Sequence, residues 1–319
     1  MAELSIALRV DAIPVRQVSK FNLRRSLELA ASMGCQGVEL CGRTVLPISE
    51  LSDTAVRALR KMLDDLNLRV VSLRFQTTHG YDHVPGLDQR LEATKLAMKA
   101  AYRLGAPTVV NQIGPVPELP SRPPAAPQAV LDASTLSSLV SPDAAPPDDD
   151  VVRRILAAGS ESPPLDSGET AEQQRWNTMQ SVLEDLGRYG AKVGAFFAAE
   201  TGTESGPTLA RLLRASDEAF LMAALNPGQL IINRHSVSEA IAALRDRISV
   251  VSAIDGVLDL AEGRGLTVPL GQGIADFPNL IGQLEEIPYR GSFVVGRANM
   301  EPETAVDELR QSTAYLANM

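Results

Sequence analysis

Charged side chains stand at the ends of several short apolar runs of this sequence. Three of these runs end at or beside Arg9, Arg74 and Arg297, a fourth carries Glu39 close to its end, and a fifth ends beside Glu200. If the runs are strands of one parallel sheet, their carboxyl ends meet at a single edge, where such sheets bind ligands. Arginine binds carboxylates and phosphates through paired hydrogen bonds, so an anionic ligand such as a phosphorylated sugar is expected there. The alternative is that these arginines form buried pairs with acids such as Glu39.

Two side chains are candidates for proton transfer. His79 lies in the segment TTHGYDH after an apolar run, and neutral imidazole can act as an acid or a base near pH 7. Glu200, in AAETG, is the second candidate, as a catalytic base. The alternatives are a solvated loop histidine at 79 and a carboxylate at 200 that pairs with an arginine. His83 and His235 are expected at surface or helix-end positions.

Short apolar runs rich in β-branched residues alternate with longer segments of helical period. Eight strands are predicted, at 4–10, 36–41, 68–74, 107–112, 192–199, 219–225, 248–254 and 292–296. Helices are predicted between and after them, at 19–33, 51–66, 87–104, 170–189, 206–216, 236–245, 275–286 and 301–317. Eight βα units close a barrel, so we expect an α/β fold in which residues 1–319 form a single (β/α)₈ TIM barrel.

Residues 115–168 interrupt the alternation. They are rich in Pro, Ala, Ser and Asp, as in SPDAAPPDDD, and contain almost no aromatic side chains. Such a composition buries too little surface to offset the entropy of the chain. We expect a long, low-complexity and largely disordered insertion after the fourth strand, which is either a flexible lid over the barrel mouth or an inert insertion.

The composition excludes several classes of partner. The formal net charge is −9 and the pI is about 5.0, which disfavours binding to nucleic acid. No run approaches the ~18 apolar residues of a membrane helix. We therefore expect a cytoplasmic protein that binds a small molecule, with no membrane and no nucleic acid as partner, and homo-oligomerisation remains possible. Cys35 and Cys41 flank a predicted strand, and we expect them not to bridge each other.

Four segments of the C-terminal half carry the most specific pattern. They are AAETGTESG at 198–206, LNPGQLIIN at 225–233, LRDRISVVSAIDG at 244–256 and VPLGQGIADFPNLIGQLEEIPYRGSFVVGR at 268–297. Together they resemble the xylose isomerase-like TIM-barrel family of sugar and sugar-phosphate isomerases and epimerases. The resemblance implies a divalent cation (Mn, Mg, Co or Zn) at the mouth of the barrel. Its ligands would be Glu, Asp, His and Glu at the ends of strands five to eight, and it would assist a proton or hydride shift beside a carbonyl.

This sequence keeps only one of the four ligands that the resemblance implies, Glu200. Asn226, Ser252 and Gly296 stand where the family has Asp, His and Glu. Asp255, the last residue of VSAID, keeps the acid that ends the corresponding family motif. We therefore expect a degenerate metal site without a cofactor, in which Asn226, Ser252 and Asp255 contact the substrate. Whether the chain is an enzyme stays open. One hypothesis is a sugar isomerase or epimerase acting on a polyol-like ligand at the C-terminal mouth, and the alternative is a catalytically silent, metal-free binding or regulatory protein.

Overall fold

The computed structural model describes residues 4–13, 22–118, 170–258 and 265–319. The chain divides into two compact units, one comprising Met1–Pro117 with Arg175–Met319 and the other Glu118–Gln174. The first unit is the barrel, and it contains all the candidate site residues. The predicted insertion falls almost wholly at 119–169, which lies outside the described residues. Its position after the fourth strand agrees with the chain path, because the next described helix begins at Ala171.

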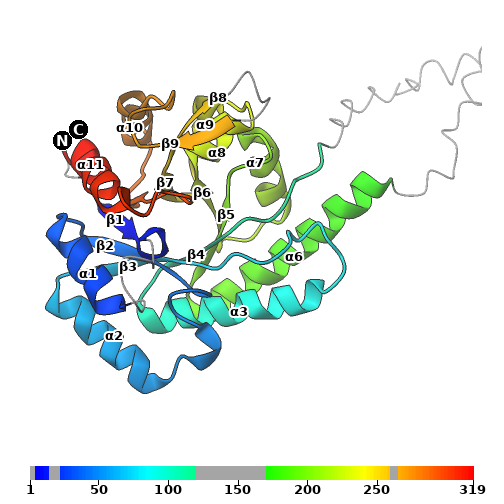
Figure 1. Ribbon diagram of the computed structural model, residues 1–319. Coiled ribbons are helices and arrows are strands. Elements are labelled where there is room, and N and C mark those ends of the chain that lie inside the picture. Colours follow the sequence, from blue (N-terminus) through cyan, green and yellow to red (C-terminus); the bar gives the residue numbers. More distant parts are fainter. Residues whose placement is uncertain (1–3, 14–21, 119–169, 259–264) are drawn as a thin grey trace, which may run out of the picture. The chain divides into compact units, whose positions relative to one another are not determined.

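Eight parallel strands form a closed barrel, as predicted (Figure 1). They are β1 (Ile6–Arg9), β2 (Gly37–Cys41), β3 (Arg69–Arg74), β4 (Thr108–Asn111), β5 (Phe196–Glu200), β6 (Leu221–Leu225), β7 (Ile248–Ala253) and β10 (Phe293–Val295). Their order around the barrel is β1-β10-β7-β6-β5-β4-β3-β2. The ring closes where β1 pairs with both β10 and β2, and this last pairing sets Arg9 level with Glu39.

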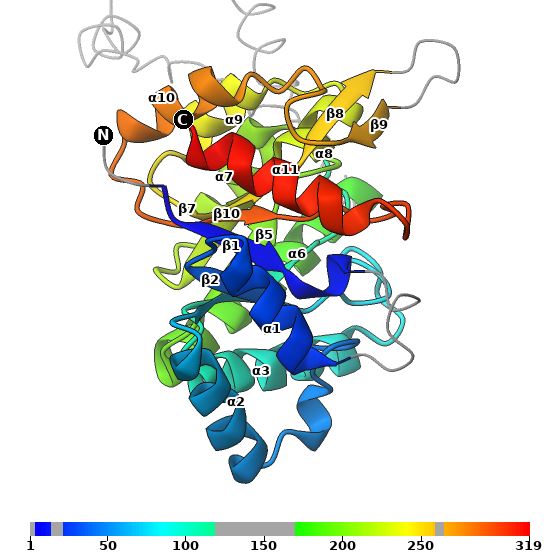
Figure 2. The same ribbon diagram turned by 60° about the vertical axis from the view of Figure 1, so that its left-hand side comes forward.

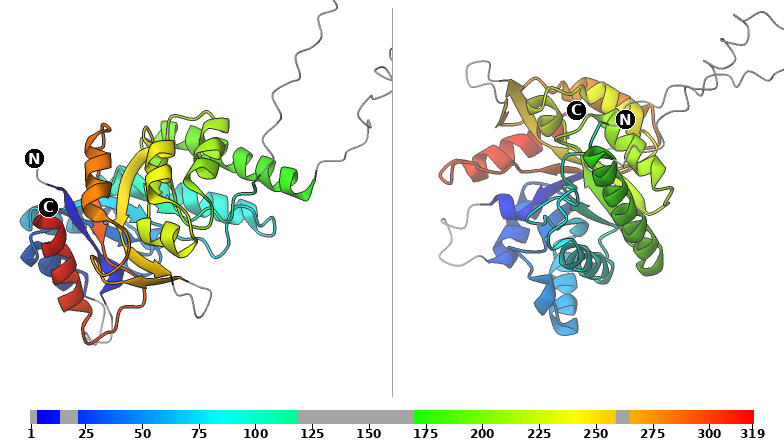
Figure 3. Two further views of the ribbon diagram at one scale, coloured as in Figure 1. Left: turned by 90° about the horizontal axis from the view of Figure 1, so that it is seen from above. Right: turned by 90° about the vertical axis from the view of Figure 1, so that its right-hand side faces the viewer.

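Helices surround the strands (Figure 2). They are α1 (Leu23–Ser32), α2 (Asp53–Asp65), α3 (Leu87–Leu104), α6 (Ala171–Val193), α7 (Gly206–Ala215), α9 (Val237–Leu244), α10 (Phe277–Glu285) and α11 (Ala305–Ala317). Side-chain oxygens of Asn22, Ser52, Ser205 and Ser236 cap four of their N-termini. The last helix, α11, contacts the first strand, β1 (Figure 3). The N-terminal and C-terminal parts of the chain therefore lie side by side in the barrel.

Five further elements of the described residues follow strand ends or lie in loops and were not predicted. They are α8 (Pro227–Ile232), the 3₁₀ turns η1 (Val10–Ala12) and η3 (Ile48–Glu50), and an antiparallel hairpin of β8 (Asp255–Leu258) and β9 (Gly265–Val268). Six residues are too few to show a helical period, which explains why α8 is not evident from the sequence. Both α8 and the hairpin follow the carboxyl ends of barrel strands, so they lie on the face that carries Glu200.

Small and β-branched side chains fill the barrel interior. The buried cluster consists of Ala7, Val71, Val110, Ala198, Ala224, Val250 and Val294, one from each of seven strands. Cys35 and Cys41 are both free and buried, as predicted, and burial raises the pKa of Cys35 to about 11. None of the helices in the described ranges is long and apolar enough to cross a membrane.

Candidate functional site

Glu200 is buried at the end of β5, where its carboxylate forms a two-pronged ion pair with Arg74. Nη1 of Arg74 donates to Oε1 over 3.0 Å, and Nη2 donates to Oε2 over 2.7 Å. Arg74 ends β3, and β4 separates that strand from β5 in the barrel. The guanidinium therefore reaches Glu200 across the barrel mouth rather than along neighbouring strands. The predicted alternative that Glu200 pairs with an arginine describes the observed contact.

A second buried ion pair lies beside the first. Nε of Arg9 donates to Oε1 of Glu39 over 2.7 Å, and Ser72 Oγ donates to the other oxygen of Glu39 over 2.7 Å. Arg9 also donates from Nη1 to the carbonyl oxygen of Gly296 and from Nη2 to Ser252 Oγ, over 2.9 and 3.2 Å. Arg9 is thus held by groups from three other strands or strand ends, β2, β7 and the end of β10.

Ser252 and Asn226 join the two pairs into one network. Ser252 Oγ accepts from Arg9 and donates to Glu200 Oε1 over 3.1 Å. Asn226 Nδ2 donates to the same oxygen over 3.0 Å, while Asn226 Oδ1 caps α8 by accepting from the amide of Gln229. The prediction that Asn226 and Ser252 lie near Glu200 is consistent with these contacts. Their role in substrate binding stays a prediction, because their polar atoms already bond within the network.

The network fixes the ionisation of Glu200. Burial alone raises the pKa of this carboxyl, but the charge and hydrogen bonds of Arg74, together with Arg9 and Asn226, lower it to about 2. The carboxylate of Glu200 in turn raises the pKa of Arg74 above its ordinary value, against the effect of burial. A carboxylate with a pKa near 2 is a weak proton acceptor at neutral pH. This electrostatic setting favours a structural ion pair over a catalytic base.

The side chains around Glu200 do not fit a divalent cation. Both carboxylate oxygens already bond to the Arg74 guanidinium, and a cation placed there would meet a positive charge instead of a third or fourth ligand. Within the part of the chain that the structure describes, no three His, Cys, Asp or Glu side chains gather closely enough to hold a metal. The observed donor set therefore disagrees with the cation that the resemblance implies.

Gly296 adds a steric obstacle to a metal ligand at its position. Its φ is +126°, a conformation that favours glycine, and a Cβ built there would lie 2.8 Å from Ala12 Cβ and 3.0 Å from Arg9 Cβ. A glutamate at 296 would require both the backbone and Arg9 to move. A single substitution at 296 would therefore not place a carboxylate there without a change in the local backbone.

Asp255 holds the loop between β9 and α10. Its Oδ1 accepts from the amides of Gly256 and Ala275, and its Oδ2 accepts from the amides of Gly271 and Gly273, all over 2.8–3.1 Å. A Cβ on Gly273 would collide with this carboxylate. Both oxygens are thus occupied by backbone amides, which gives Asp255 a structural role. Its predicted contact with substrate stays untested.

The remaining predicted residues lie apart from the network. Arg297 forms a two-pronged pair with Glu308 of α11, over 2.7 and 2.9 Å. His79 is exposed after β3, and its ring centroid lies 4.5 Å from that of His83. His235 contacts the carbonyl oxygen of Thr203 through Nε2 over 3.1 Å. The three arginines predicted to bind substrate each pair with a glutamate, so their charges are neutralised within the fold.

His79 lines a cavity of about 330 Å³ on the C-terminal face of the barrel. The lining comes from the segments after β2 and β3 and from α3, and includes Arg43, Phe75, Thr77 and Gln89. The Arg43 guanidinium lies over the Phe75 ring, 5.5 Å from its centroid, and also donates to the carbonyl oxygen of Gln76. The cavity is thus lined mainly by hydrogen-bonding groups, with the Arg43 guanidinium between it and the buried Phe75 ring.

Two polar residues of this face were not singled out from the sequence. Ser72 orients Glu39, and Glu204 lies buried in the loop between β5 and α7. Oε2 of Glu204 accepts from Thr203 Oγ1 over 2.8 Å, but Oε1 is buried with no hydrogen-bond partner among the described residues. Burial, with a smaller effect from the charge of Glu200, raises the pKa of Glu204 to about 7. The only sequence feature that could have pointed to Glu204 as a site residue is its place in the segment AAETGTESG, four residues after Glu200.

Glu204 is expected to make stability fall as the pH rises. A carboxyl with a folded-state pKa near 7 and an ordinary unfolded value of 4.5 stabilises the fold fully below pH 4.5, and that contribution is lost between about pH 4.5 and 7. Glu204→Gln removes this titration. The variant should be more stable than the wild type by about 2–3 kcal/mol at pH 8 and nearly equal to it at pH 4.5. Urea denaturation at both pH values measures the difference.

The exposed Glu286 on the C-terminal side of α10 provides a matched control for this charge change. Glu286→Gln should leave the pH dependence of the free energy of unfolding unchanged. Equal stability of Glu204→Gln and the wild type at pH 8 would show that Glu204 is ionised in the folded protein at little cost.

The sequence and the fold both match known proteins. The profile of the xylose isomerase-like TIM-barrel family matches residues 27–141 and 144–319. No curated protein matches the chain. A xylose isomerase domain protein from Planctomyces limnophilus superimposes with a TM-score of 0.67 at 16% identity, over 98% of this chain and 95% of that one.

Two further solved structures share this fold. The 3-keto-D-glucoside 4-epimerase of E. coli has a TM-score of 0.64 at 14% identity, over 99% of this chain and 100% of its own. A xylose isomerase-like TIM-barrel protein from Mycobacterium smegmatis, in complex with magnesium, has a TM-score of 0.62 at 14% identity, over 99% and 96% of the two chains. At these identities the likeness establishes the fold.

Proposed function

Because the chain belongs to the xylose isomerase-like TIM-barrel family, we propose that it binds a small polyol or sugar-like ligand at the C-terminal face of its barrel without a divalent cation. In this proposal the chain does not carry out the metal-assisted proton or hydride shift beside a carbonyl. It is a binding or regulatory member of a family of sugar isomerases and epimerases.

One observation carries the proposal, the two-pronged pair between Arg74 and Glu200. A guanidinium supplies one positive charge and five N–H donors, but it has no open coordination position for substrate oxygens. Both Glu200 oxygens are engaged by it, and Ser252 and Asn226 contribute neutral donors to one of them. The arrangement therefore supplies neither the Lewis acid nor the free carboxylate that the metal-assisted reaction needs.

The ligand class follows from the groups left available on this face. Arg9 and Arg74 are neutralised by Glu39 and Glu200, which weakens the case for an anion at the barrel axis. The cavity beside His79 offers an imidazole, an amide, hydroxyl groups and the Arg43 guanidinium, which lies over the buried Phe75 ring. Hydroxyl-rich ligands match such donors and acceptors. These groups support a polyol or sugar-like ligand.

Proton exchange in D₂O tests the absence of a metal-assisted proton shift, and the appearance of isomerised sugar without deuterium in the same spectra tests for a hydride shift. Ketoses and aldoses are incubated with the protein and added Mn²⁺, Mg²⁺ or Co²⁺, and ¹H NMR follows deuterium incorporation beside the carbonyl. The proposal predicts incorporation no faster than in protein-free samples with the same ion. Metal-dependent exchange that stops on addition of a chelator would identify an active isomerase or epimerase instead.

Calorimetric titration with neutral sugars and polyols tests the binding function. A bound polyol should lose affinity in His79→Ala and Gln89→Ala, by about fivefold or more for each hydrogen bond removed. Lys99→Ala is the control, because Lys99 is exposed on the same helix as Gln89 and does not line the cavity. Chelator should not change the affinity of the wild type. Equal affinities of all three variants would place the ligand elsewhere.

A further inference from the structure

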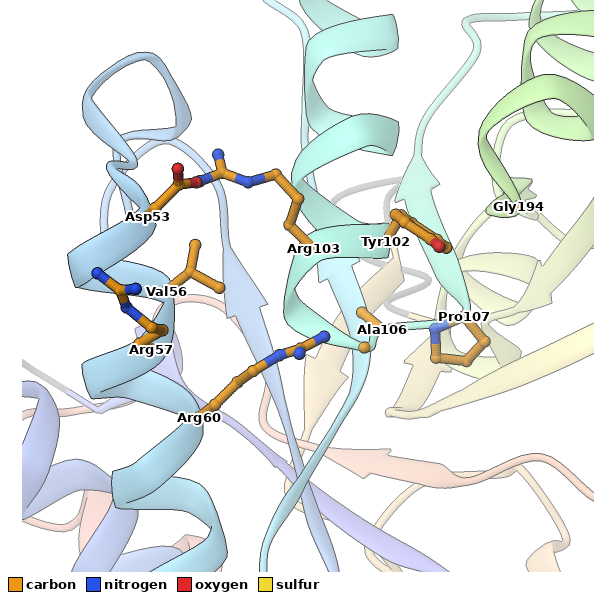
Figure 4. Close-up of a pocket in the computed structure, with 10 residues that line it drawn as sticks. Asp53, Val56, Arg57, Arg60, Tyr102, Arg103, Ala106, Pro107 and Gly194 are labelled. Carbon is orange, nitrogen blue, oxygen red and sulfur yellow. The ribbon is translucent and has the colours of Figure 1, made fainter.

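A second cavity, of about 720 Å³, lies at the other end of the barrel strands (Figure 4). It is formed by the first turns of α2, the last turn of α3 and the turns that lead into β4 and β5. Pro107 directly precedes β4 and Gly194 lies just before β5, so both mark amino ends of strands. Glu200 and the His79 cavity lie beyond the carboxyl ends. This cavity is therefore separate from the candidate site already described.

Three arginines line the cavity against a single carboxylate. Arg103 donates to Asp53 over 2.6 Å and to the carbonyl oxygen of Leu51 over 2.8 Å. Arg57 and Arg60 are exposed and have no carboxylate partner among the described residues, and Arg57 makes only a 3.4 Å hydrogen bond to Thr54. Figure 4 shows Arg60 reaching from α2 toward the end of α3, while the Arg57 side chain points to the other side of α2. An excess of two positive charges is notable on a chain whose net charge is −9.

An aromatic ring stands beside these charges. Tyr102 is 61% exposed although it is large and apolar over most of its surface. Its side chain lies near Gly194 and Pro107 along one wall of the cavity (Figure 4). An exposed ring in the same cavity as guanidinium groups can pack against the flat or apolar part of a ligand whose anionic part they bind.

A purely structural explanation accounts for part of this arrangement. Arg60 lies close to Gly105, at the end of α3, where a cation compensates the negative end of the helix dipole. That explanation covers neither Arg57, one turn earlier on α2, nor the exposure of Tyr102. A ligand that carries both an anionic group and a ring accounts for all three.

We propose that this cavity binds a small organic phosphate, with Arg60 contacting the phosphate, the exposed Arg57 side chain turning toward it from the previous turn of α2, and Tyr102 contacting the ring attached to it. Phosphate is favoured over a single carboxylate because its several oxygens can accept from two guanidinium groups at once. The site is independent of the proposed polyol site on the opposite face.

Calorimetric titration of the full chain with pyrophosphate and with a nucleoside diphosphate tests the proposal at low ionic strength. The wild type should bind both with dissociation constants below about 1 mM, and affinity should fall as salt is added. Arg57→Ala/Arg60→Ala should weaken binding of both at least about tenfold. Tyr102→Ala should weaken binding of the nucleoside diphosphate and leave pyrophosphate unchanged.

The control is a double variant with the same loss of charge, Lys99→Ala/Arg188→Ala, at exposed positions outside the cavity. It should bind both ligands like the wild type, and circular dichroism should show that both double variants are folded. Failure of the wild type to bind at 5 mM (about five times the expected upper limit) would overturn the proposal. So would equal losses in the two double variants, because binding would then follow net charge alone. Equal effects of Tyr102→Ala on both ligands would overturn the role given to the ring.

Discussion

Arg74→Met is expected to destabilise the fold by about 3–5 kcal/mol, because it leaves the Glu200 carboxylate buried without its ionic partner. Methionine keeps much of the arginine stem, so the loss reports chiefly on charge and hydrogen bonding. Denaturant unfolding at pH 7 measures it. Removing both partners in Arg74→Met/Glu200→Gln should cost less than the single change at Arg74, because no uncompensated charge remains.

The pH dependence of the same variants provides a sharper test. In the wild type the pKa of Glu200 is lowered to about 2, so its contribution to stability is fully present above its unfolded value of 4.5 and is lost as the pH falls from 4.5 toward 2. That contribution amounts to about 3 kcal/mol. Without Arg74, burial is expected to dominate and raise the pKa of Glu200, so stability should instead fall as the pH rises above 4.5.

A surface pair serves as the control for these measurements. Arg214 and Asp246 are separated by 3.6 Å, and both side chains are more than half exposed. Arg214→Met should cost no more than about 1 kcal/mol. A loss at Arg74 as small as the loss at Arg214, or an unchanged pH profile, would contradict the buried pair.

Asp255→Ala is expected to cost about 3–5 kcal/mol, because it removes the acceptor for four backbone amides. Asp255→Asn should also destabilise the fold, since the amide NH₂ would place donors against donors. The loop from Gly271 to Ala275 should exchange its amide hydrogens faster in both variants. Thermal unfolding and hydrogen exchange measure the two effects.

Asp276 lies at the end of the same loop and provides a control. It is exposed and accepts one hydrogen bond, from the amide of Asn279, as the N-cap of α10. Asp276→Ala should cost about 1 kcal/mol. If Asp255→Ala cost no more than that, the loop would not depend on the Asp255 carboxylate.

The sequence was sufficient to predict the barrel because its strands and helices follow simple periods. Buried runs such as RVVSLR have the composition of a strand, and segments such as 87–104 have the period of a helix. Glycine or proline separates the two kinds of segment. Helix α3 was predicted with the observed bounds. The hairpin of β8 and β9 was missed because it begins directly where β7 ends, so one apolar run contains the start of both elements.

The site could be predicted only in part. Resemblance to a family located Glu200, Asn226 and Ser252, which the fold brings into one network. The partner of Glu200 could not be identified, because Arg74 lies 126 residues away on a strand that does not adjoin β5. Local periodicity says nothing about such a contact. The buried Glu204 was missed for a similar reason, since its burial depends on how its loop packs.

Metal binding to the purified protein tests the central claim, that the Arg74 guanidinium takes the place of a cation at Glu200. Isothermal titration with Mn²⁺, Co²⁺, Mg²⁺ and Zn²⁺ is combined with elemental analysis of the protein before and after dialysis against chelator. The predicted result is no saturable binding by the wild type. Any metal found with the wild type should be found in equal amount with Glu200→Gln. One equivalent of chelator-sensitive metal that is lost in Glu200→Gln would contradict the claim.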